Sequence, residues 1–299
     1  MRKHEAFAAG GASGEVFRKW CWLIVLVAGM MGMMGAAGDA PVVAETVTVD
    51  TKPDAIIALA GVNDCHTQGM TIVAGHLFVS CVDRKKKRGM VYRFDLPSDF
   101  PAAGEALSVP VSADVTSGSR YHPSGLDHDG ECVWVAAANY RSFLAQSRVI
   151  CLDPESLAEE SSFMVEDHLG ALAVMGDQLV GLNWDAKAFY RFDKKGAFLG
   201  KDPSPTGLAY QNCQGLSATS ILCSGSIKQQ GVWSAAVDLL VFDPSSTSHW
   251  RAARRTLISV PSMNLGREAF AVSGNAWLFL PEDFPGARIY AFTGIQSSN

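Results

Sequence analysis

Cys65-His66-Thr67-Gln68-Gly69-Met70 and the residues that follow, 71–80, set the pattern for the rest of the chain. They read as a turn into a strand, a hairpin marked by Gly75, and a second strand. The pattern returns four times, at intervals of roughly 40–55 residues, a period typical of propellers and other repeat arrays. The four returns are His122-Pro123-Ser124-Gly125-Leu126, His168-Leu169-Gly170-Ala171-Leu172, Asn212-Cys213-Gln214-Gly215-Leu216 and Gly266-Arg267-Glu268-Ala269-Phe270.

Each repeat continues with a third strand, and four repeats have a fourth, outer strand. The expected outer strands are 106–109, 162–165, 196–199 and 256–260. The fifth repeat ends without one, whereas an unused strand at 54–60 precedes the first repeat. We therefore predict an all-β fold, a five-bladed β-propeller of four-stranded blades closed by an N-terminal strand in the last blade. No segment after residue 40 has a convincing helical period, which argues against alternating helices and strands.

The N-terminal segment has the features of an export signal. Four basic residues, Arg2, Lys3, Arg18 and Lys19, precede an apolar run over 20–37, and small residues follow. This order predicts a signal peptide over 1–40 and a single propeller domain over 41–299. The alternative is an uncleaved anchor formed by residues 20–37, because that run just reaches the length of a spanning helix. The protein is thus expected to be secreted or periplasmic, and the membrane is a partner only if the segment stays uncleaved.

The charge of the predicted domain argues against nucleic acid as a partner. Removing four of 25 basic and three of 30 acidic residues leaves 21 against 27, an excess of six negative charges. Nucleic-acid-binding domains usually carry a basic stripe instead. The one basic run, 84–88, lies between two strands and is interpreted as a solvated hairpin loop. We expect the domain to be a monomer.

Six cysteines remain after the signal segment, an even number that favours disulfides in an exported chain. Hairpin register suggests the partners, because cross-strand neighbours bring their Cβ atoms within bridging range. A hairpin centred between residues 141 and 142 places Cys132 opposite Cys151. The expected pairs are Cys65–Cys81, Cys132–Cys151 and Cys213–Cys223. Buried free thiols are the alternative.

Three histidines occupy equivalent positions at the start of successive blades, where innermost strands converge on the axis. They are His66, His122 and His168, with Asn212 at the same position of the fourth repeat. Amide and carboxylate groups lie two residues further along, at Gln68, Gln214 and Glu268. Neutral imidazoles with nearby oxygens suit a borderline divalent metal, which makes the three histidines candidate metal ligands. The alternatives are hydrogen bonds between neighbouring blades, or a polar ligand bound by the same residues without metal.

A second ring of candidates follows the second strands. The ring consists of Ser80, Asn139-Tyr140, Asn183-Trp184, Ser224 and Glu282-Asp283. Tyr140 and Trp184 could form an aromatic floor for a sugar or another ring. Packing between blades is the alternative. No phosphate-binding loop, serine-hydrolase elbow or zinc-protease motif is present in the sequence. We predict that an exported propeller binds a small polar ligand, with or without a divalent metal, at the mouth of its central channel. A metal-assisted lyase or hydrolase and a protein-interaction scaffold are the alternatives.

Several of these motifs resemble known families. The segments 121–130, 167–170, 210–214 and 222–225 resemble a bacterial family of exported propellers of unknown function. That family is similar to the group of quinoprotein amine dehydrogenase β-chain-like and YVTN-type propellers. The resemblance implies the fold and export, and it implies no activity.

Thr67-Gln68-Gly69-Met70 is similar to the T-Q-G-L motif of the five-bladed glutaminyl cyclotransferases, and Asn183-Trp184 to a later motif of theirs. Where those enzymes carry a glutamate after the second strand of the first blade, this chain has Ser80-Cys81, with Asp83 further on. The acid–base group that cyclisation requires is therefore missing from its expected place. A divergent cyclotransferase is a further alternative.

Overall fold

The computed structural model describes residues 43–62, 64–101, 106–140 and 145–295. The chain divides into two compact units, Met1–Asp39 and Ala40–Asn299, and all described residues belong to the second. The predicted signal peptide or anchor lies outside the described residues. Within them, no helix is both long and apolar enough to span a membrane.

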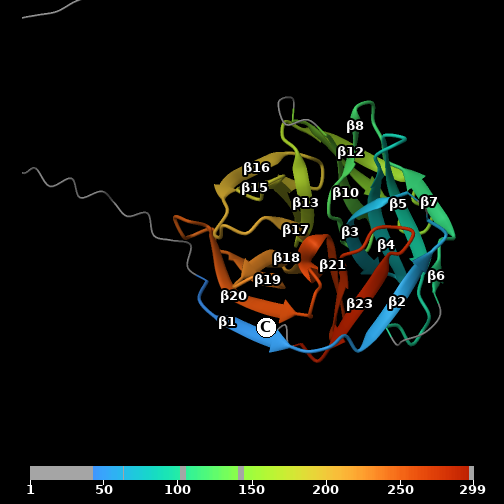
Figure 1. The fold of residues 1–299 in the computed structure, drawn as a ribbon. Helices are drawn as coiled ribbons and strands as arrows, with labels where there is room; N and C mark the ends of the chain where they lie inside the picture. Colours follow the sequence, from blue (N-terminus) through green and yellow to red (C-terminus); the bar gives the residue numbers. More distant parts are fainter. Residues whose placement is uncertain (1–42, 63, 102–105, 141–144, 296–299) are drawn as a thin grey trace, which may run out of the picture. The chain divides into compact units, whose positions relative to one another are not determined.

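Five sheets, whose strands are mainly antiparallel, form the five blades of a propeller, which confirms the predicted fold class (Figure 1). Blade 1 consists of β3 (His66–Val73), β4 (His76–Asp83), β5 (Arg88–Asp95) and β7 (Val111–Asp114). Blade 2 consists of β8 (Arg120–Pro123), β9 (Asp127–His128), β10 (Val133–Asn139), β11 (Ser147–Leu152) and β12 (Glu159–Val165). Blade 3 consists of β13 (Leu169–Met175), β14 (Gln178–Asn183), β15 (Ala188–Asp193) and β16 (Phe198–Pro203).

Blade 4 consists of β17 (Tyr210–Ser217), β18 (Ser220–Gln229), β19 (Val232–Phe242) and β20 (Trp250–Ser259). Its outer edge carries a strand that the sequence did not predict, β1 (Thr46–Asp50), which pairs in parallel with β20. Blade 5 consists of β21 (Ala269–Ser273), β22 (Ala276–Leu280), β23 (Arg288–Thr293) and β2 (Ala55–Ala60).

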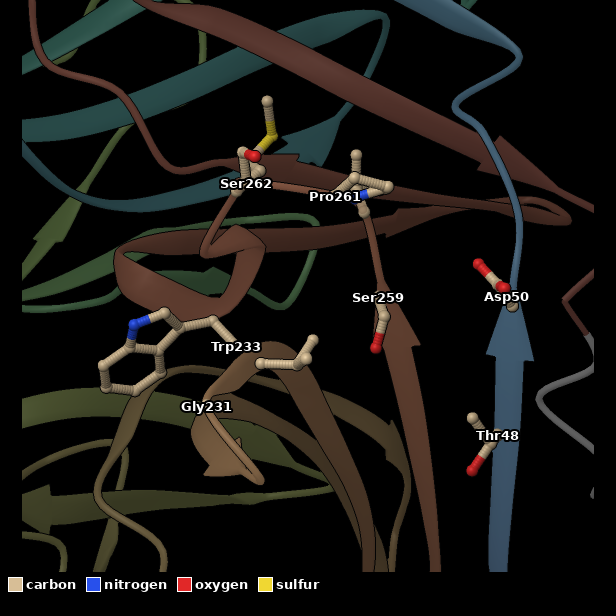
Figure 2. Close-up of a pocket in the computed structure, with 10 residues that line it drawn as sticks. Thr48, Asp50, Gly231, Trp233, Ser259, Pro261 and Ser262 are labelled. Carbon is tan, nitrogen blue, oxygen red and sulfur yellow. The ribbon is translucent and has the colours of Figure 1, made fainter.

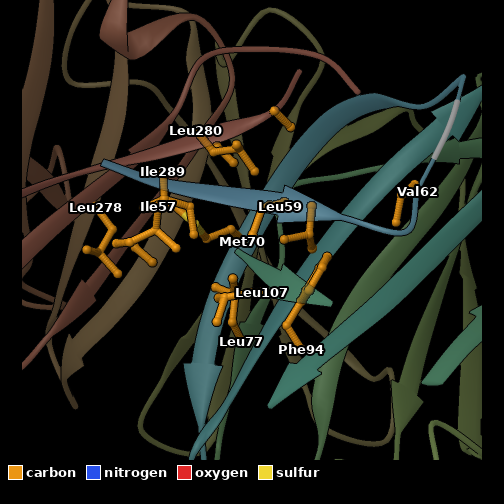
Figure 3. Packing of buried hydrophobic residues seen from close by; sticks show 14 of the residues in the cluster. Ile57, Leu59, Val62, Met70, Leu77, Phe94, Leu107, Leu278, Leu280 and Ile289 are labelled. Carbon is orange, nitrogen blue, oxygen red and sulfur yellow. The ribbon is translucent and has the colours of Figure 1, made fainter. Parts of the chain in front are cut away.

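The N-terminal strand β2 closes the ring, as predicted. It runs antiparallel to β23 with Ile57 opposite Ile289. Ala55, Ile57 and Leu59 are buried and alternate with more exposed residues, the pattern of a strand with one face in the core. These side chains fill the space between blade 5 and blade 1 (Figure 3). Closure leaves the ring without the free edge of an open array.

Two predicted outer strands were misplaced. Residues 107–108 form β6, which pairs in parallel with β2 of blade 5, whereas β7 is the outer strand of blade 1. Leu107 is buried in the core beside Leu59, so that packing draws this segment away from blade 1 (Figure 3). The outer strand of blade 4 begins at Trp250, well before the expected residue 256, because the buried Trp250 pairs with Phe242.

All three predicted disulfides are present, with Cα–Cα distances of 5.7, 5.2 and 4.1 Å for Cys65–Cys81, Cys132–Cys151 and Cys213–Cys223. Three such bridges suggest an extracellular or periplasmic protein. The register expected for the second bridge was wrong by two residues. Cys151 faces Trp134, and Cys132 lies just before β10, so the bridge crosses the hairpin diagonally.

Candidate functional site

Below the mouth of the central channel, polar side chains lie along the propeller axis and form hydrogen bonds between the blades. Asn212 is fully buried, and its amide donates to the carbonyl of Phe270 at 2.6 Å and to that of Met70 at 3.3 Å. Its side-chain oxygen accepts a hydrogen bond from the backbone N–H of Leu126 at 3.1 Å. Asn212 thus joins blade 4 to blades 1, 2 and 5.

Gln214 and Asp127 make similar connections deeper along the axis. The Gln214 amide donates to the Thr71 hydroxyl at 2.8 Å, and its oxygen accepts from the N–H of Val272 at 2.6 Å. One oxygen of the buried Asp127 accepts from the backbone N–H groups of Val174 and Gly215, at 2.8 and 2.6 Å. Burial raises the pKa of this carboxyl to about 7. Asn212 and Gln214 were predicted to bind ligand, and in the structure their amides are engaged within the protein.

Close backbone contacts narrow the axis beside Asn212. A Cβ atom on Gly69 would lie 2.4 Å from the Cα of Gly125, so that only glycine fits there. A Cβ on Gly125 would lie 2.6 Å from the Asn212 side-chain oxygen. The inner strands therefore meet almost in contact beside Asn212.

Four predicted site residues meet at this mouth, between blades 2 and 3. The ring centroids of His122 and His168 are 5.2 Å apart. Trp184 lies 5.0 Å from His122 and 4.5 Å from His168, and Tyr140 lies 4.7 Å from His122. The two imidazoles are buried, whereas Trp184 and Tyr140 remain 53% and 39% exposed. The aromatic rings thus cover the histidines and present surface to solvent.

A pocket of about 400 Å³ opens beside these rings. Its lining combines aromatic, amide and acidic side chains, contributed by Tyr140, Ala145, Asp167, His168, Asn183, Trp184 and Asp185. Asp167 accepts hydrogen bonds from the Tyr190 hydroxyl at 2.5 Å and from the backbone N–H of His168 at 2.7 Å. Asp185 forms an ion pair of 2.7 Å with the exposed Lys187. Among the described residues of the lining, the two with charged side chains at neutral pH are both carboxylates.

The two buried histidines are uncharged at neutral pH. Burial, together with the smaller effects of the neighbouring His168 and His66, lowers the pKa of His122 to about 3. Burial also lowers the pKa of His168 to about 4, although a hydrogen bond to the backbone of Asn139 opposes the shift. Nδ1 of His122 and Nε2 of His168 have no hydrogen-bond partner among the described residues. A buried nitrogen without a partner is the kind of group that a ligand or water satisfies.

His66 belongs to a separate group on the blade 5 side of the mouth. Its Nδ1 lies 2.7 Å from Asp283 Oδ1, and its Nε2 lies 3.8 Å from Glu268 Oε1. Glu268 is buried and also pairs with Arg267 at 3.2 Å. Burial raises the pKa of Glu268 to about 7, although His66 and Arg267 oppose the shift. A carboxyl with this pKa can both accept and donate a proton near neutral pH.

The predicted residues therefore fall into separate groups. His122 and His168 meet at the aromatic pocket, whereas His66 pairs with carboxylates. Over the described ranges, no group of three or more His, Cys, Asp or Glu side chains could hold a metal ion. The amide of Gln68 donates to the backbone carbonyl of its neighbour Thr67 at 2.7 Å.

The sequence analysis missed Asp167 at the mouth, whereas it placed Asp283 in the second ring of candidates without assigning it a partner. Asp167 directly precedes His168, and its position in the repeat was the available signal. Asp283 follows the second strand of blade 5, at the place equivalent to Asn183 and Trp184. Their contacts cross between strands distant in sequence, which the repeat pattern does not specify.

The closed ring of five sheets and the polar pocket at one mouth define a five-bladed β-propeller with a candidate ligand site. Residues 44–260 match the family described as "Family of unknown function (DUF6454)", and the chain belongs to this family. No curated protein matches the chain. Among solved structures, the glutaminyl cyclase of Myxococcus xanthus is similar, with a TM-score of 0.54, 13% identity, and coverage of 83% of this chain and 97% of that chain. The WD40 domain of Neurospora crassa Pan2 has a TM-score of 0.43, 10% identity, and coverage of 83% and 98%.

Proposed function

We propose that this propeller binds a small polar molecule with a positively charged nitrogen in the pocket between blades 2 and 3. One observation carries the proposal. Two half-exposed aromatic rings, Trp184 and Tyr140, border a pocket that the carboxylates of Asp167 and Asp185 also line, and these are the charged groups among its described lining residues. Aromatic faces and carboxylates together attract organic cations.

The buried histidines strengthen this preference. Their low pKa values keep both rings neutral, so they add no positive charge that would repel a cation. The unpartnered Nε2 of His168 can accept a hydrogen bond from a ligand N–H, since the ring's other hydrogen bond goes to the backbone of Asn139. The ion pair between Asp185 and the exposed Lys187 is a surface pair, which a ligand ammonium can replace at little free-energy cost.

Titration calorimetry with phenethylamine and benzyltrimethylammonium tests the proposal. Trp184→Ala should raise the Kd of both cations by at least about tenfold, because the substitution removes the larger of the two aromatic faces. Trp233→Ala is the matched control. Trp233 is 42% exposed and lines a different pocket, beside Ser259 and Pro261 (Figure 2). Saturable binding that Trp184→Ala leaves unchanged, or no binding of either cation to the wild type, would contradict the proposal.

A second candidate function is the cyclisation of N-terminal glutamine, favoured by Glu268. The similarity to a glutaminyl cyclase concerns the fold, and the sequence lacks that enzyme type's glutamate in blade 1. Glu268 could supply the missing group from blade 5, since its pKa near 7 suits a general acid–base. In such a reaction the α-amine attacks the side-chain amide carbon, a lactam forms and ammonia leaves. Glu268 would take a proton from the attacking amine and return it to the departing ammonia.

Ammonia release from glutaminyl-alanine tests this second candidate. The candidate is supported if the wild type releases ammonia and Glu268→Gln lowers that rate by at least about 100-fold. Circular dichroism should show that the variant keeps its fold. The same loss in Glu131→Gln, which changes an exposed glutamate in a hairpin turn, would contradict it. So would the absence of ammonia release by the wild type at high enzyme concentration.

The divalent ion at His66, His122 and His168 stays a prediction. Metal analysis of purified, untagged protein tests it. About one bound ion per chain in the wild type, and none in His122→Ala, would support the prediction. A metal content far below one ion per chain after reconstitution with Zn²⁺ would contradict it.

A further inference from the structure

Blade 4 carries two features beyond its four core strands. Its strands β18 and β19 are 10 and 11 residues long, whereas the second and third strands of the other blades have five to eight. Gly225 pairs with Tyr210, the first residue of β17, so the hairpin after Gly225 projects beyond the innermost strand. The second feature is β1, which lies at the outer edge of the same sheet. The ring is closed by β2, so closure requires neither of them.

The two features meet at a pocket of about 610 Å³, which we call the hairpin pocket. The tip of the hairpin contributes Gly231, Val232 and Trp233, and β1 contributes Thr48 and Asp50 (Figure 2). The volume lies within the range of small-molecule sites, about 300–1,000 Å³. None of these residues lines the pocket between blades 2 and 3. The rest of the lining comes from the end of β20 and the turn after it, with Ser259, Val260, Pro261, Ser262 and Met263.

Hydrogen bonds fix the walls of the hairpin pocket. The hydroxyl groups of Ser234, in the hairpin, and Ser259, in β20, lie 2.6 Å apart. The N–H of Met263 donates to the carbonyl of Val260 at 3.2 Å and closes the turn. The whole of β1, Thr46–Asp50, is paired with β20. The pocket therefore lies among paired strands rather than on an unsupported loop.

The hairpin tip presents apolar surface to the solvent. Val232 and Trp233 are 55% and 42% exposed, so they bury little apolar area in the fold. Nζ of Lys228 lies 5.3 Å from the centroid of the Trp233 ring. The protein's own ammonium group thus already makes the contact that a cationic ligand would make with this ring. An uncharged ligand suits the hairpin pocket better.

Oxygen atoms line the other side of the hairpin pocket. In Figure 2, Thr48 and Asp50 lie on β1 across from Trp233, with Ser259 between them. The carboxylate of Asp50 can accept hydrogen bonds from ligand hydroxyl groups. The hydroxyl groups of Thr48 and Ser262 can both donate and accept them.

We propose that the hairpin pocket binds a neutral saccharide, with a sugar ring stacked on Trp233. A sugar ring has an apolar face of C–H groups, which packs against an aromatic ring. The hydroxyl groups at its rim form hydrogen bonds with Asp50, Thr48 and Ser262. This site is separate from the proposed function and does not depend on it.

Saturation-transfer NMR with methyl β-glucoside, N-acetylglucosamine and cellobiose tests the inference on the wild-type protein. At least one of these sugars should bind with a Kd of about 1 mM or lower. Sorbitol has the hydroxyl groups of glucose on an open chain and lacks a fixed apolar face. It should therefore bind at least about tenfold more weakly than the best sugar.

Trp233→Ala should raise the Kd of the bound sugar by at least about tenfold, because the substitution removes the aromatic face. Asp50→Asn keeps the shape of the side chain and should raise the Kd about three- to tenfold, because hydrogen bonds to a neutral amide are weaker. Trp184→Ala is the matched control and should leave the Kd within about twofold, because Trp184 lines the pocket between blades 2 and 3.

The inference fails if none of the three sugars binds at concentrations up to about 10 mM. It also fails if the wild type and Trp233→Ala bind the sugar equally well. These two results leave the proposed function standing, because that function is tested with cations. An equal loss in Trp184→Ala and Trp233→Ala would likewise overturn the inference, since the sugar would then not be specific to the hairpin pocket.

Discussion

Asn212→Ala should destabilise the propeller without changing its affinity for ligands. The substitution leaves the N–H of Leu126 and the carbonyl of Phe270 buried without a partner, and it also removes the longer bond to Met70. An unsatisfied buried backbone group costs about 1–3 kcal/mol. Two such groups and the lost third bond give a decrease of roughly 3–5 kcal/mol in the free energy of unfolding. This is a large part of the 5–15 kcal/mol typical of a folded domain.

Urea denaturation followed by tryptophan fluorescence measures the decrease, with the disulfides intact. Gln229→Ala, at an exposed position near the end of β18, is the matched control and should change stability by less than about 0.5 kcal/mol. The Kd for phenethylamine should stay within about twofold of the wild type under conditions where both proteins are folded.

Two results would refute this reasoning. A loss of less than about 1 kcal/mol would mean that the three hydrogen bonds of Asn212 contribute little. A large loss of affinity at unchanged stability would mean that Asn212 binds ligand, as the sequence alone predicted.

Three further substitutions test the fold. The pKa of Asp127 is raised to about 7 from about 4 in the unfolded chain, so its contribution to stability is present below pH 4 and is lost as pH rises through 7. Between pH 5.5 and 8, thermal unfolding should therefore show a smaller loss of stability for Asp127→Asn than for the wild type. Equal losses in the two proteins would contradict this. Replacing both Cys132 and Cys151 by Ala should cost roughly 3 kcal/mol in urea denaturation, the value expected for a loop of this length, and a loss below about 1 kcal/mol would count against it. Ile57→Ala should cost about 2–5 kcal/mol, because it removes buried contacts where β2 closes the ring; an unchanged unfolding midpoint would argue against that role.

The repeat pattern was sufficient to predict the blades and their closure. Each repeat contains strands whose alternation and turn residues are local properties, and local properties are visible in sequence. The closing strand was predictable because the fifth repeat lacked an outer strand and 54–60 had no other partner. The disulfide partners followed from the same hairpins.

The outer strands were less predictable, because their pairing depends on contacts outside their own blade. Residues 106–109 were expected to pair with blade 1, but Leu107 is buried and pairs with Leu59 of blade 5 instead. The side chains of β1 are mostly exposed, and the strand is held by its pairing with β20. Its sequence therefore lacks the alternation of apolar and polar residues that would have predicted a strand. A similar limit applies to the hairpin of Cys132, whose register differs by two residues from the one expected.

The candidate residues lie at different depths along the propeller axis, and the sequence could not show this difference. Asn212 and His168 occupy equivalent positions in their repeats, yet the Asn212 amide bonds to three other blades, whereas His168 keeps an unpartnered nitrogen beside an open pocket. The difference arises from their neighbours. Gly69 and Gly125 let the backbones close around Asn212, while Trp184 and Tyr140 hold the mouth open above His168. A polar residue at the start of an inner strand therefore joins blades where the strands meet closely, and it is available to a ligand only where aromatic side chains keep them apart.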